Sequence, residues 1–263
     1  MLVVLMFSVI IILFTWSGCK KDDSTSKSST SYDLKSKDVL GVTGKVTFLE
    51  TSATTATIEI VLNNAPSGTH PAGLYMDSEV ENGASVIALN SVDESGKSST
   101  VVTNMTYGQL IAYDGNIKVM KSSSETGVIL AQGDIGGNVL TTVNKTYTLD
   151  TIAALGVSGT ALFEKRANGN TLVTLSLTGT INGDVYPATI NLGSITSIGG
   201  GPVVKTLSSV PGTEGKSFTN IRQLDSGTKI TYDDWLVYVG YINIYQIAID
   251  PVNIISHGNI GTN

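Results

Sequence analysis

Residues that can bind metals or act as nucleophiles are scarce in this chain. Its 263 residues include one cysteine, Cys19, and two histidines, His70 and His257. A conventional zinc site needs about four protein ligands when it is structural and about three when it is catalytic. One cysteine also forms no disulfide within the chain. These counts argue against metal chemistry before any motif is considered.

Two further features have the residue types used in catalysis but not the required pattern. Residues 212–217 read GTEGKS, yet a phosphate-binding loop needs a glycine where Val210 stands, and the flanks alternate like strands. We therefore expect a hairpin-like loop there. The neighbouring carboxylates of Asp233 and Asp234 diverge on either a strand or a helix. We expect them to begin a helical turn at 233–237, and a second single turn at 107–111.

The remaining composition is that of a β-rich globular protein. The chain is 41% hydrophobic and 14% charged, with 28 glycines, which excludes disordered, collagen-like and coiled-coil classes. With 16 Lys and Arg against 22 Asp and Glu, the net charge is −6. A negative chain of this kind lacks the basic surface that binds phosphate backbones, so we expect no nucleic-acid partner.

The chain contains an internal duplication. Residues 106–138 and 231–263 align without a gap, and both begin with Thr-Tyr and end near a Gly-x-Ile-Gly sequence. Upstream, Phe48 aligns with Phe163, and the HPA sequence at 70–72 aligns with YPA at 186–188. Repeats at this spacing indicate two homologous domains, each large enough to have a core of its own.

Each repeat shows hydrophobic residues at every second position. This alternation places one side of a strand in a core and the other toward water. Val, Thr and Ile dominate these segments, which is typical of strands. We expect an all-β fold of two small sandwiches. The alternating positions are Val46, Phe48, Ile58, Ile60, Leu62, Val173, Leu175, Leu177, Ile242 and Ile244.

The N-terminus has the features of an export signal. Residues 2–16 are uncharged and mostly apolar, shorter than the roughly 20 residues of a membrane-spanning helix. Ser17 and Gly18 precede Cys19, a sequence that resembles a bacterial lipobox. The resemblance implies cleavage before Cys19 and acylation of that residue, so that fatty acyl chains anchor the protein in a membrane. An ordinary signal peptide with an incidental cysteine is the alternative.

The next residues, 20–23, read KKDD and resemble the export signal that follows the acylated cysteine in surface lipoproteins of Bacteroidetes type. This resemblance implies an outer-membrane lipoprotein exposed at the cell surface, whereas a solvated run of charges is the alternative. The polar segment that follows predicts a flexible tether. The expected organisation is a signal peptide at 1–18, a tether at 19–38, sandwiches at 39–139 and 157–263, and a connecting strand at 140–156.

Both repeats resemble the CHRD domain, the module named from chordin. The residues that carry the resemblance are HPAGLY at 70–75, GNIKVM at 115–120 and GDIG at 133–136, with YPATIN at 186–191, GYINIY at 240–245 and GNIG at 258–261 in the second repeat. The resemblance implies a Greek-key β-sandwich like that of copper/zinc superoxide dismutases. In the family, His-x-His and a later histidine occupy strand positions similar to copper ligands.

The chain departs from the family at those positions. The His-x-His positions hold Gly73 and Tyr75 in the first repeat, and the later histidine is Met120. In the second repeat the same positions hold other residues, Thr189, Asn191 and Tyr245. Only His70 remains among the family's imidazoles, so His70 and Met120 mark a vestigial metal position and we expect no cofactor.

These features favour a non-enzymatic surface lipoprotein that has a binding or envelope-structural role. Aromatic residues dominate protein and glycan contacts, so the candidate contact residues, together with His70, are Tyr75, Tyr186, Trp235, Tyr241 and Tyr245. Burial in the cores is the other interpretation of these side chains. A degenerate copper- or zinc-binding protein using His70 is the alternative function. A third hypothesis is a small ligand beside Tyr75, in space left by Gly73.

Overall fold

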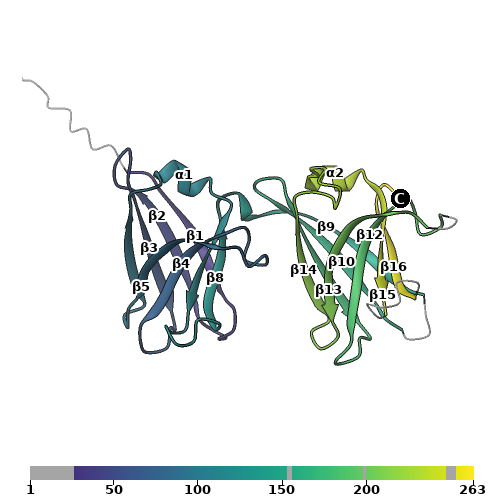
Figure 1. Cartoon of the computed structure of the whole chain (residues 1–263), viewed down its shortest axis with the longest axis horizontal. Helices are drawn as coiled ribbons and strands as arrows, with labels where there is room; N and C mark the ends of the chain where they lie inside the picture. The colour runs from purple at the N-terminus through teal and green to yellow at the C-terminus, as the bar shows by residue number, and fades with distance from the viewer. Residues whose placement is uncertain (1–26, 153–155, 198–199, 247–252) are drawn as a thin grey trace, which may run out of the picture.

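The structure, a computed structural model, describes residues 27–152, 156–197, 200–246 and 253–263. They form two β-sandwich units that lie side by side along the long axis (Figure 1). Unit one consists of β1 (Ser29–Ser36), β2 (Thr43–Glu50), β3 (Ala56–Asn63), β4 (His70–Met76), β5 (Ser85–Val92), β6 (Lys97–Val102), α1 (Tyr107–Ile111), β7 (Gly115–Met120), β8 (Ile129–Ile135) and the 3-10 turn η1 (Gly136–Asn138). Unit two consists of β9 (Leu140–Thr151), β10 (Ser158–Arg166), β11 (Thr171–Thr178), β12 (Val185–Leu192), β13 (Val203–Pro211), β14 (Lys216–Ile221), α2 (Tyr232–Leu236), β15 (Val239–Tyr245) and β16 (Ile254–Gly261).

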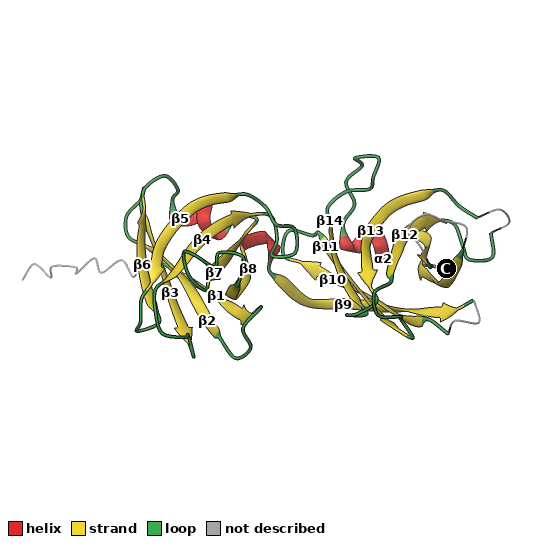
Figure 2. Cartoon of the chain, turned by 60° about the horizontal axis from the view of Figure 1, so that its bottom comes forward, coloured by secondary structure: helices red, strands yellow, loops and turns green. Residues whose placement is uncertain are grey.

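The two units have the same topology, as the internal duplication predicts. The strand order is β5-β4-β7-β8-β1-β2-β3-β6 in unit one and β13-β12-β15-β16-β9-β10-β11-β14 in unit two. Each strand of unit one therefore has its counterpart eight strands later, and all named pairings are antiparallel (Figure 2). The all-β prediction with two tandem sandwiches is confirmed.

The ends of each sheet order are brought together by side-chain hydrogen bonds. In unit one the Asn90 amide nitrogen of β5 donates to Thr100 Oγ1 of β6 at 2.8 Å. In unit two the Ser208 amide nitrogen of β13 donates to Thr219 Oγ1 of β14 at 2.9 Å. Since β7 also pairs with β4, the strands β7-β4-β5-β6 form a Greek key, which confirms the expected connectivity.

Each unit has its own hydrophobic core. The predicted alternation is confirmed, because Val46, Phe48, Ile58 and Ile60 are fully buried in one core while Val173 and its partners on β11 are buried in the other. On β2 and β3 the side chains between these positions are mostly polar and more exposed, whereas on β11 Leu172 and Thr174 are buried as well. Two separate cores mean that each repeat is a domain in its own right.

The expected flexible tether is wrong for residues 29–36, which form β1. This strand pairs with β2 through Ser29–Leu34 and with β8 through Lys35 and Ser36. Its apolar residues are only two, Tyr32 and Leu34, and both face the core. Tyr32 packs edge-on against Phe48 with ring centroids 5.6 Å apart. The outward side carries only serine, aspartate and lysine, which gave this strand the composition of a linker.

The second boundary is also corrected. The expected connecting strand at 140–156 is β9, the first strand of unit two rather than a link between units. Tyr147 and Leu149 correspond to Tyr32 and Leu34, and Tyr147 packs on Phe163 with centroids 5.3 Å apart. The shared Tyr-x-Leu sequence is the signal that would have located both first strands.

Both predicted helical turns are confirmed. Each begins with a capping box, which is a pair of reciprocal hydrogen bonds between the N-cap threonine and the third residue of the helix. The threonine hydroxyl accepts from the backbone N–H of the third residue, and the side chain of that residue accepts from the backbone N–H of the threonine. Thr106 and Gln109 form this box in α1, and Thr231 and Asp234 form it in α2. Asp233 and Asp234 thus belong to a helix start, as expected, and not to a catalytic pair.

The last glycine of the Gly-x-Ile-Gly sequence has a structural role in both units. Gly136 and Gly261 have φ values of +56° and +70°, in the left-handed region. A Cβ atom at Gly136 would lie 2.2 Å from the Tyr113 carbonyl oxygen, and one at Gly261 would lie 1.8 Å from the equivalent oxygen of Tyr238. Only glycine allows this close approach at the end of β8 and β16.

Candidate functional site

The positions that the resemblance assigns to metal ligands do come together on one side of β4 and β7. In unit one, the Tyr75 hydroxyl donates to Met120 Sδ at 4.0 Å. Lys118 Nζ, between them on β7, lies 5.2 Å from the centroid of the Tyr75 ring. Tyr75 and Met120 therefore meet, and the group that they form with Lys118 consists of a phenol, a thioether and an ammonium group.

The space beside Gly73 is filled by Tyr75. A Cβ atom at Gly73 would lie 2.9 Å from Cε2 of that ring. Glycine on a strand allows an aromatic neighbour to lie flat over the backbone. The hypothesis of a small ligand beside Tyr75, in space left by Gly73, is wrong because the tyrosine ring itself covers this position.

His70 does not join this group. It is 1% exposed and lies on the opposite side of β4 from Tyr75, since successive side chains of a strand alternate. Its Nδ1 lies 2.7 Å from the Lys121 carbonyl oxygen, and its Nε2 lies 2.9 Å from the Pro66 carbonyl oxygen. The ring therefore ties β4 to the chain after β7 and to the loop before β4, and neither nitrogen faces Met120.

In unit two the same positions form a hydrogen-bonded group. Thr189 Oγ1 donates to Asn191 Oδ1 at 2.6 Å and lies 3.2 Å from the Tyr245 hydroxyl. The Asn191 side-chain nitrogen donates to the Gly201 carbonyl oxygen at 2.9 Å. These side chains use their polar atoms on one another and on the backbone.

The donor sets of both units do not fit a copper or zinc ion. Such sites are built mainly from imidazole, thiolate or carboxylate ligands, and the groups present are a phenol, one thioether, amides and a hydroxyl. A thioether binds reduced copper, but one thioether alone does not make a site. Among the residues with a described structure, no group of three or more His, Cys, Asp and Glu side chains is placed to hold a metal ion. No chemistry of a metal is derived from this site.

The expectation that the candidate aromatic residues are exposed is wrong for four of them, and burial, the other interpretation, is correct. Trp235 is fully buried between Phe163 and Tyr238. Tyr186 and Tyr241 are buried too, and their hydroxyl oxygens accept hydrogen bonds from backbone N–H groups. The donors are Ile181 for Tyr186 and Gly201 for Tyr241, each at 2.8 Å. Tyr245 is 8% exposed, and Tyr75 is partly buried. Side chains that anchor loops in this way offer little surface to a partner.

The second histidine of the chain, His257, lies within β16. His257 pairs with Asn243 on one side and with Asp150 on the other. Burial lowers the pKa of the His257 imidazole, and the nearby Asp150 carboxylate acts in the opposite direction. This histidine belongs to a strand face in unit two and lies in a different unit from His70.

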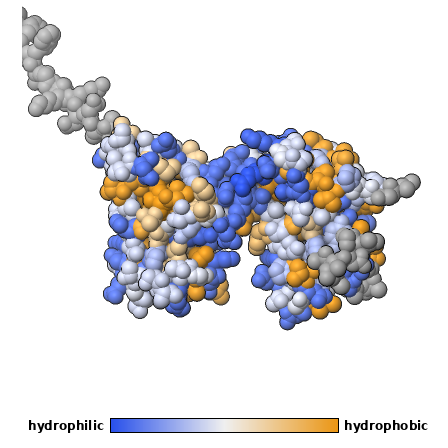
Figure 3. Space-filling view, in the orientation of Figure 1, coloured by the Kyte–Doolittle hydropathy of each residue, from blue (hydrophilic) through white to orange (hydrophobic). Residues whose placement is uncertain are grey.

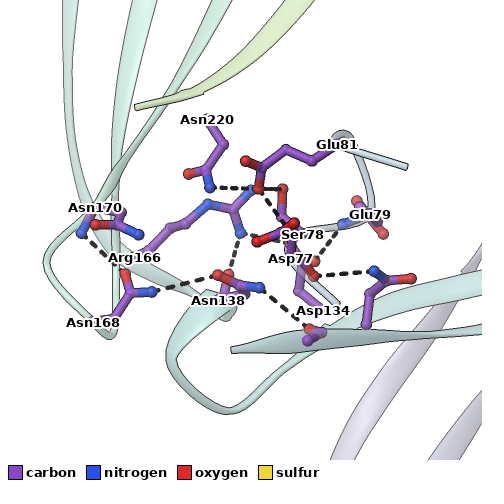
Figure 4. Close-up of polar contacts among 12 residues, drawn as sticks. Asp77, Ser78, Glu79, Glu81, Asp134, Asn138, Arg166, Asn168, Asn170 and Asn220 are labelled. Atoms are coloured by element: carbon purple, nitrogen blue, oxygen red, sulfur yellow. Dashed lines mark hydrogen bonds and ion pairs between the residues drawn. The ribbon is translucent and has the colours of Figure 1, made fainter. Parts of the chain in front are cut away.

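The most developed polar site joins the two units, and sequence reasoning missed it. Asp134 at the end of β8 accepts the Glu79 amide at Oδ1 (2.7 Å) and contacts Arg166 Nη1 through Oδ2 at 2.5 Å. Arg166 ends β10 in unit two and is fully buried. Its Nη1 also donates to the Asn138 carbonyl oxygen (Figure 4).

A second group of charges lies beside the first. Arg222, which follows β14, donates from Nη1 to Asp77 Oδ1 at 2.8 Å and from Nη2 to Glu81 Oε1 at 3.0 Å. The Asn220 side-chain nitrogen donates to Glu81 Oε2 at 2.7 Å. Unit two thus supplies two guanidinium groups and an amide, and unit one supplies the carboxylates. Figure 3 shows hydrophilic residues gathered where the units meet.

Burial raises the pKa of two carboxyl groups at this junction. It raises the pKa of Asp134, while the charge and hydrogen bond of Arg166 act to lower it. It also raises the pKa of Glu79, and the nearby Asp134 carboxylate adds to this increase. The ion pair with Arg166 therefore only partly offsets the loss of water around these groups.

The signal for this junction lies in the differences between the repeats. The four acidic residues align by strand register with uncharged residues in unit two, and the two arginines align with threonines in unit one. The aligned pairs are Asp77 with Gly193, Glu79 with Ile195, Glu81 with Ser197, Asp134 with Asn259, Arg166 with Thr51 and Arg222 with Thr103.

The alignment is supported by matching backbone contacts. Asn259 accepts the Ile195 amide at 3.0 Å, just as Asp134 accepts the Glu79 amide. Each repeat therefore kept the loop anchor, and only unit one added the charge that binds an arginine of the other unit. Complementary charges at one end of each unit favour this pairing of the two units.

The predicted acylation residue, Cys19, lies outside the described residues. Within the described ranges, no helix has both the length and the apolar character to cross a bilayer. No protein-family model, curated protein or solved structure matches the chain.

Proposed function

We propose that this protein is a non-enzymatic lipoprotein, anchored in the outer membrane through acyl chains on Cys19 and exposed at the cell surface. Its two CHRD-like sandwiches have a binding or envelope-structural role, with a protein or a glycan as the partner. The tether runs from Cys19 to the start of β1 at Ser29.

One observation supports a non-enzymatic role most strongly. At the positions that the family resemblance links to metal ligands, both units carry side chains that bond to one another, Tyr75 with Met120 and Thr189 with Asn191 and Tyr245. Polar atoms that are already paired have little capacity to bind a substrate or ion, because a new bond must first break an existing one.

The anchor is supported by the residues around Cys19. An apolar segment, small residues and a cysteine followed by charges form the order that a lipobox requires. Acyl chains contribute roughly 0.8 kcal/mol per buried methylene, and two chains are enough for stable attachment.

Labelling with a palmitate analogue tests the anchor. We expect the wild-type chain to incorporate the label and to sediment with membranes, and Cys19→Ser to lose the label and become soluble. Ser24→Ala, in the same segment, is the matched control and should behave as wild type. A Cys19→Ser chain that keeps the label would overturn the anchor.

Elemental analysis of the purified chain tests the non-enzymatic role. We expect copper and zinc well below one equivalent, with no change in His70→Ala. One equivalent of copper or zinc that disappears in His70→Ala would replace this proposal with the metal-binding alternative.

A further inference from the structure

The junction between the units contains a cavity of about 340 Å³. Pockets that bind small molecules are typically about 300–1,000 Å³ and often lie between domains. Both units contribute to its lining, which includes Asp114, Asn138, Asn168, Asn170, Asn220 and Arg222. Figure 4 labels the four asparagines. The cavity is therefore of the size and in the place expected for a ligand site.

The lining is polar and its charges balance. Asp77 and Asp114 oppose Arg222 and Lys229, and Ile230 is the one apolar side chain in the lining. A phosphate or carboxylate ligand would need an excess of positive charge, which this cavity lacks. An apolar ligand would need a hydrophobic wall. The lining therefore favours an uncharged ligand with many hydrogen-bonding groups.

Asparagine side chains provide the bonding groups that such a ligand needs. Each amide carries an acceptor oxygen and a donor nitrogen in one plane, so it can bond two neighbouring hydroxyl groups at once. The lining includes four of them, at positions 138, 168, 170 and 220. The hydroxyl groups of a ligand both donate and accept hydrogen bonds. They therefore match the donors and acceptors of these amides better than a ligand group that only donates or only accepts.

Several of these side chains are held in place while keeping free atoms. Asn168 is fixed by Asn138 Oδ1, which accepts its side-chain nitrogen at 3.4 Å, and by the Asn170 amide, which donates to its Oδ1 at 3.0 Å. Asn220 is fixed through its nitrogen by Glu81. Its Oδ1 is buried and has no partner among the residues that the structure describes.

This free oxygen shows that the protein groups at the junction do not use all of their hydrogen-bonding capacity on one another. A buried acceptor without a partner is unfavourable by roughly 1–3 kcal/mol, so a donor is expected to occupy its neighbourhood. In Figure 4 the nitrogen of Asn220 faces Glu81 and its oxygen points away from that bond.

We propose that the junction cavity binds an uncharged saccharide, a single sugar residue or a disaccharide unit of a glycan chain. This inference rests on the proposed binding role and names its ligand class. The site exists only when the two units are docked, because Asn138 and Asp114 come from unit one whereas Asn168, Asn170 and Asn220 come from unit two. Unit two supplies most of the lining, and unit one completes it with Asp77, Asp114 and Asn138.

Saturation-transfer NMR with the purified full chain tests this proposal. The probes are cellobiose, maltose, lactose and N,N′-diacetylchitobiose, with glucose 6-phosphate as the charged comparison. We expect saturation transfer to at least one neutral disaccharide and a weaker signal from the phosphate. Titration calorimetry then gives the affinity of that disaccharide.

Two variants locate the site. Asn170→Ala removes one cavity amide whose side chain has no partner within the described part of the chain, and Asn144→Ala removes an exposed amide on β9 outside the cavity. We expect Asn170→Ala to weaken binding at least 10-fold and Asn144→Ala to leave it unchanged. Circular dichroism confirms that both variants fold.

The outcomes separate this inference from the proposed function. Saturation transfer to none of the four disaccharides, or binding that Asn170→Ala leaves unchanged, would overturn the saccharide site. Neither result affects the anchor or the metal content, which the Cys19→Ser and His70→Ala variants measure independently.

Discussion

Asp134 Oδ2 of unit one lies 2.5 Å from Arg166 Nη1 of unit two, and the Arg166 side chain is fully buried. This contact joins the end of β8 to the end of β10 across the junction. A buried ion pair stabilises a structure mainly by making the alternative arrangements unfavourable, since a lone buried charge is far worse than a paired one. The pair therefore specifies how the two units dock.

The first prediction concerns this pair. Arg166→Met leaves the Asp134 carboxylate buried and without its cation, so we expect the free energy of unfolding to fall by roughly 3–5 kcal/mol. Combining Arg166→Met with Asp134→Asn removes both charges, and we expect it to restore most of that loss. Urea denaturation measures the four members of this cycle. Small-angle scattering should show a larger radius of gyration for the single variant.

An exposed ion pair is the control for this cycle. Lys45 Nζ lies 2.6 Å from Asp33 Oδ1, with side chains that are 66% and 70% exposed. Lys45→Ala should leave both stability and scattering nearly unchanged, because solvent screens such a pair. Equal effects of Lys45→Ala and Arg166→Met would contradict a special role for the junction.

The second prediction concerns pH. Burial raises the pKa of the Glu79 carboxyl, so the folded state binds more protons than the unfolded state and stability from this group falls as pH rises. Glu79→Gln removes this effect. We expect Glu79→Gln to be more stable than wild type at pH 7, with the gain disappearing as the pH falls below the unfolded carboxyl pKa of about 4.3.

Thermal denaturation at a series of pH values from about 3.5 to about 8 measures this dependence, because that series extends from below to well above the ordinary carboxyl pKa of about 4. A gain in Glu79→Gln that stays the same at every pH would mean that ionisation of Glu79 has no part in it.

The third prediction concerns Gly73 and the ring of Tyr75. Gly73→Ala places a methyl group 2.9 Å from Tyr75 Cε2, which displaces the ring from Met120. We expect a loss of about 1 kcal/mol in stability, typical of overpacking. In a Tyr75→Ala background the same change should stabilise the protein by roughly 0.5–1 kcal/mol, because alanine is favoured over glycine in a strand. Equilibrium denaturation that gives the same effect in both backgrounds would contradict this contact.

The fourth prediction concerns His70. Its ring is buried and bonds to the carbonyl oxygens of Lys121 and Pro66, so His70→Ala removes both packing and polar contacts. We expect a loss of about 3 kcal/mol, within the range for large-to-small core substitutions. Addition of a chelator should leave the melting temperature of wild type and variant unchanged. A drop in the melting temperature of wild type alone on chelation would show that the ring binds a metal.

Much of the fold could be predicted because its causes are local. Alternation at Val46 and Phe48 specifies strands with one apolar side, and the Thr-Tyr pairs at 106 and 231 mark helix starts through a capping box. The strand β1 was missed because only Tyr32 and Leu34 of its residues are apolar. A strand whose outer side carries serine, aspartate and lysine has the composition of a linker, and pairing with two neighbours decides its structure.

The exposure and contacts of the candidate site residues were predicted less well, because they depend on which groups pack against each side chain in the folded protein and not on the residue type. The family resemblance linked His70 with Met120 as a vestigial metal position, whereas the structure brings Tyr75 to Met120 and leaves His70 on the opposite side of β4. The sequence did not decide that Tyr186 and Tyr241 are buried, because their hydroxyl groups accept hydrogen bonds from loop amides, of Ile181 and of Gly201, whose positions only the folded chain shows. Exposure of an aromatic residue depends on which loop covers it.

By itself the sequence determined two homologous all-β units, because repeated alternation and glycine positions act over a few residues at a time. Only the tertiary structure decided which charges meet at the junction. Asp134 and Arg166 belong to different repeats, and each is an ordinary charged residue until docking removes both from water. Burial then makes their pairing, and the amide-lined cavity beside it, a property of the assembled pair of units.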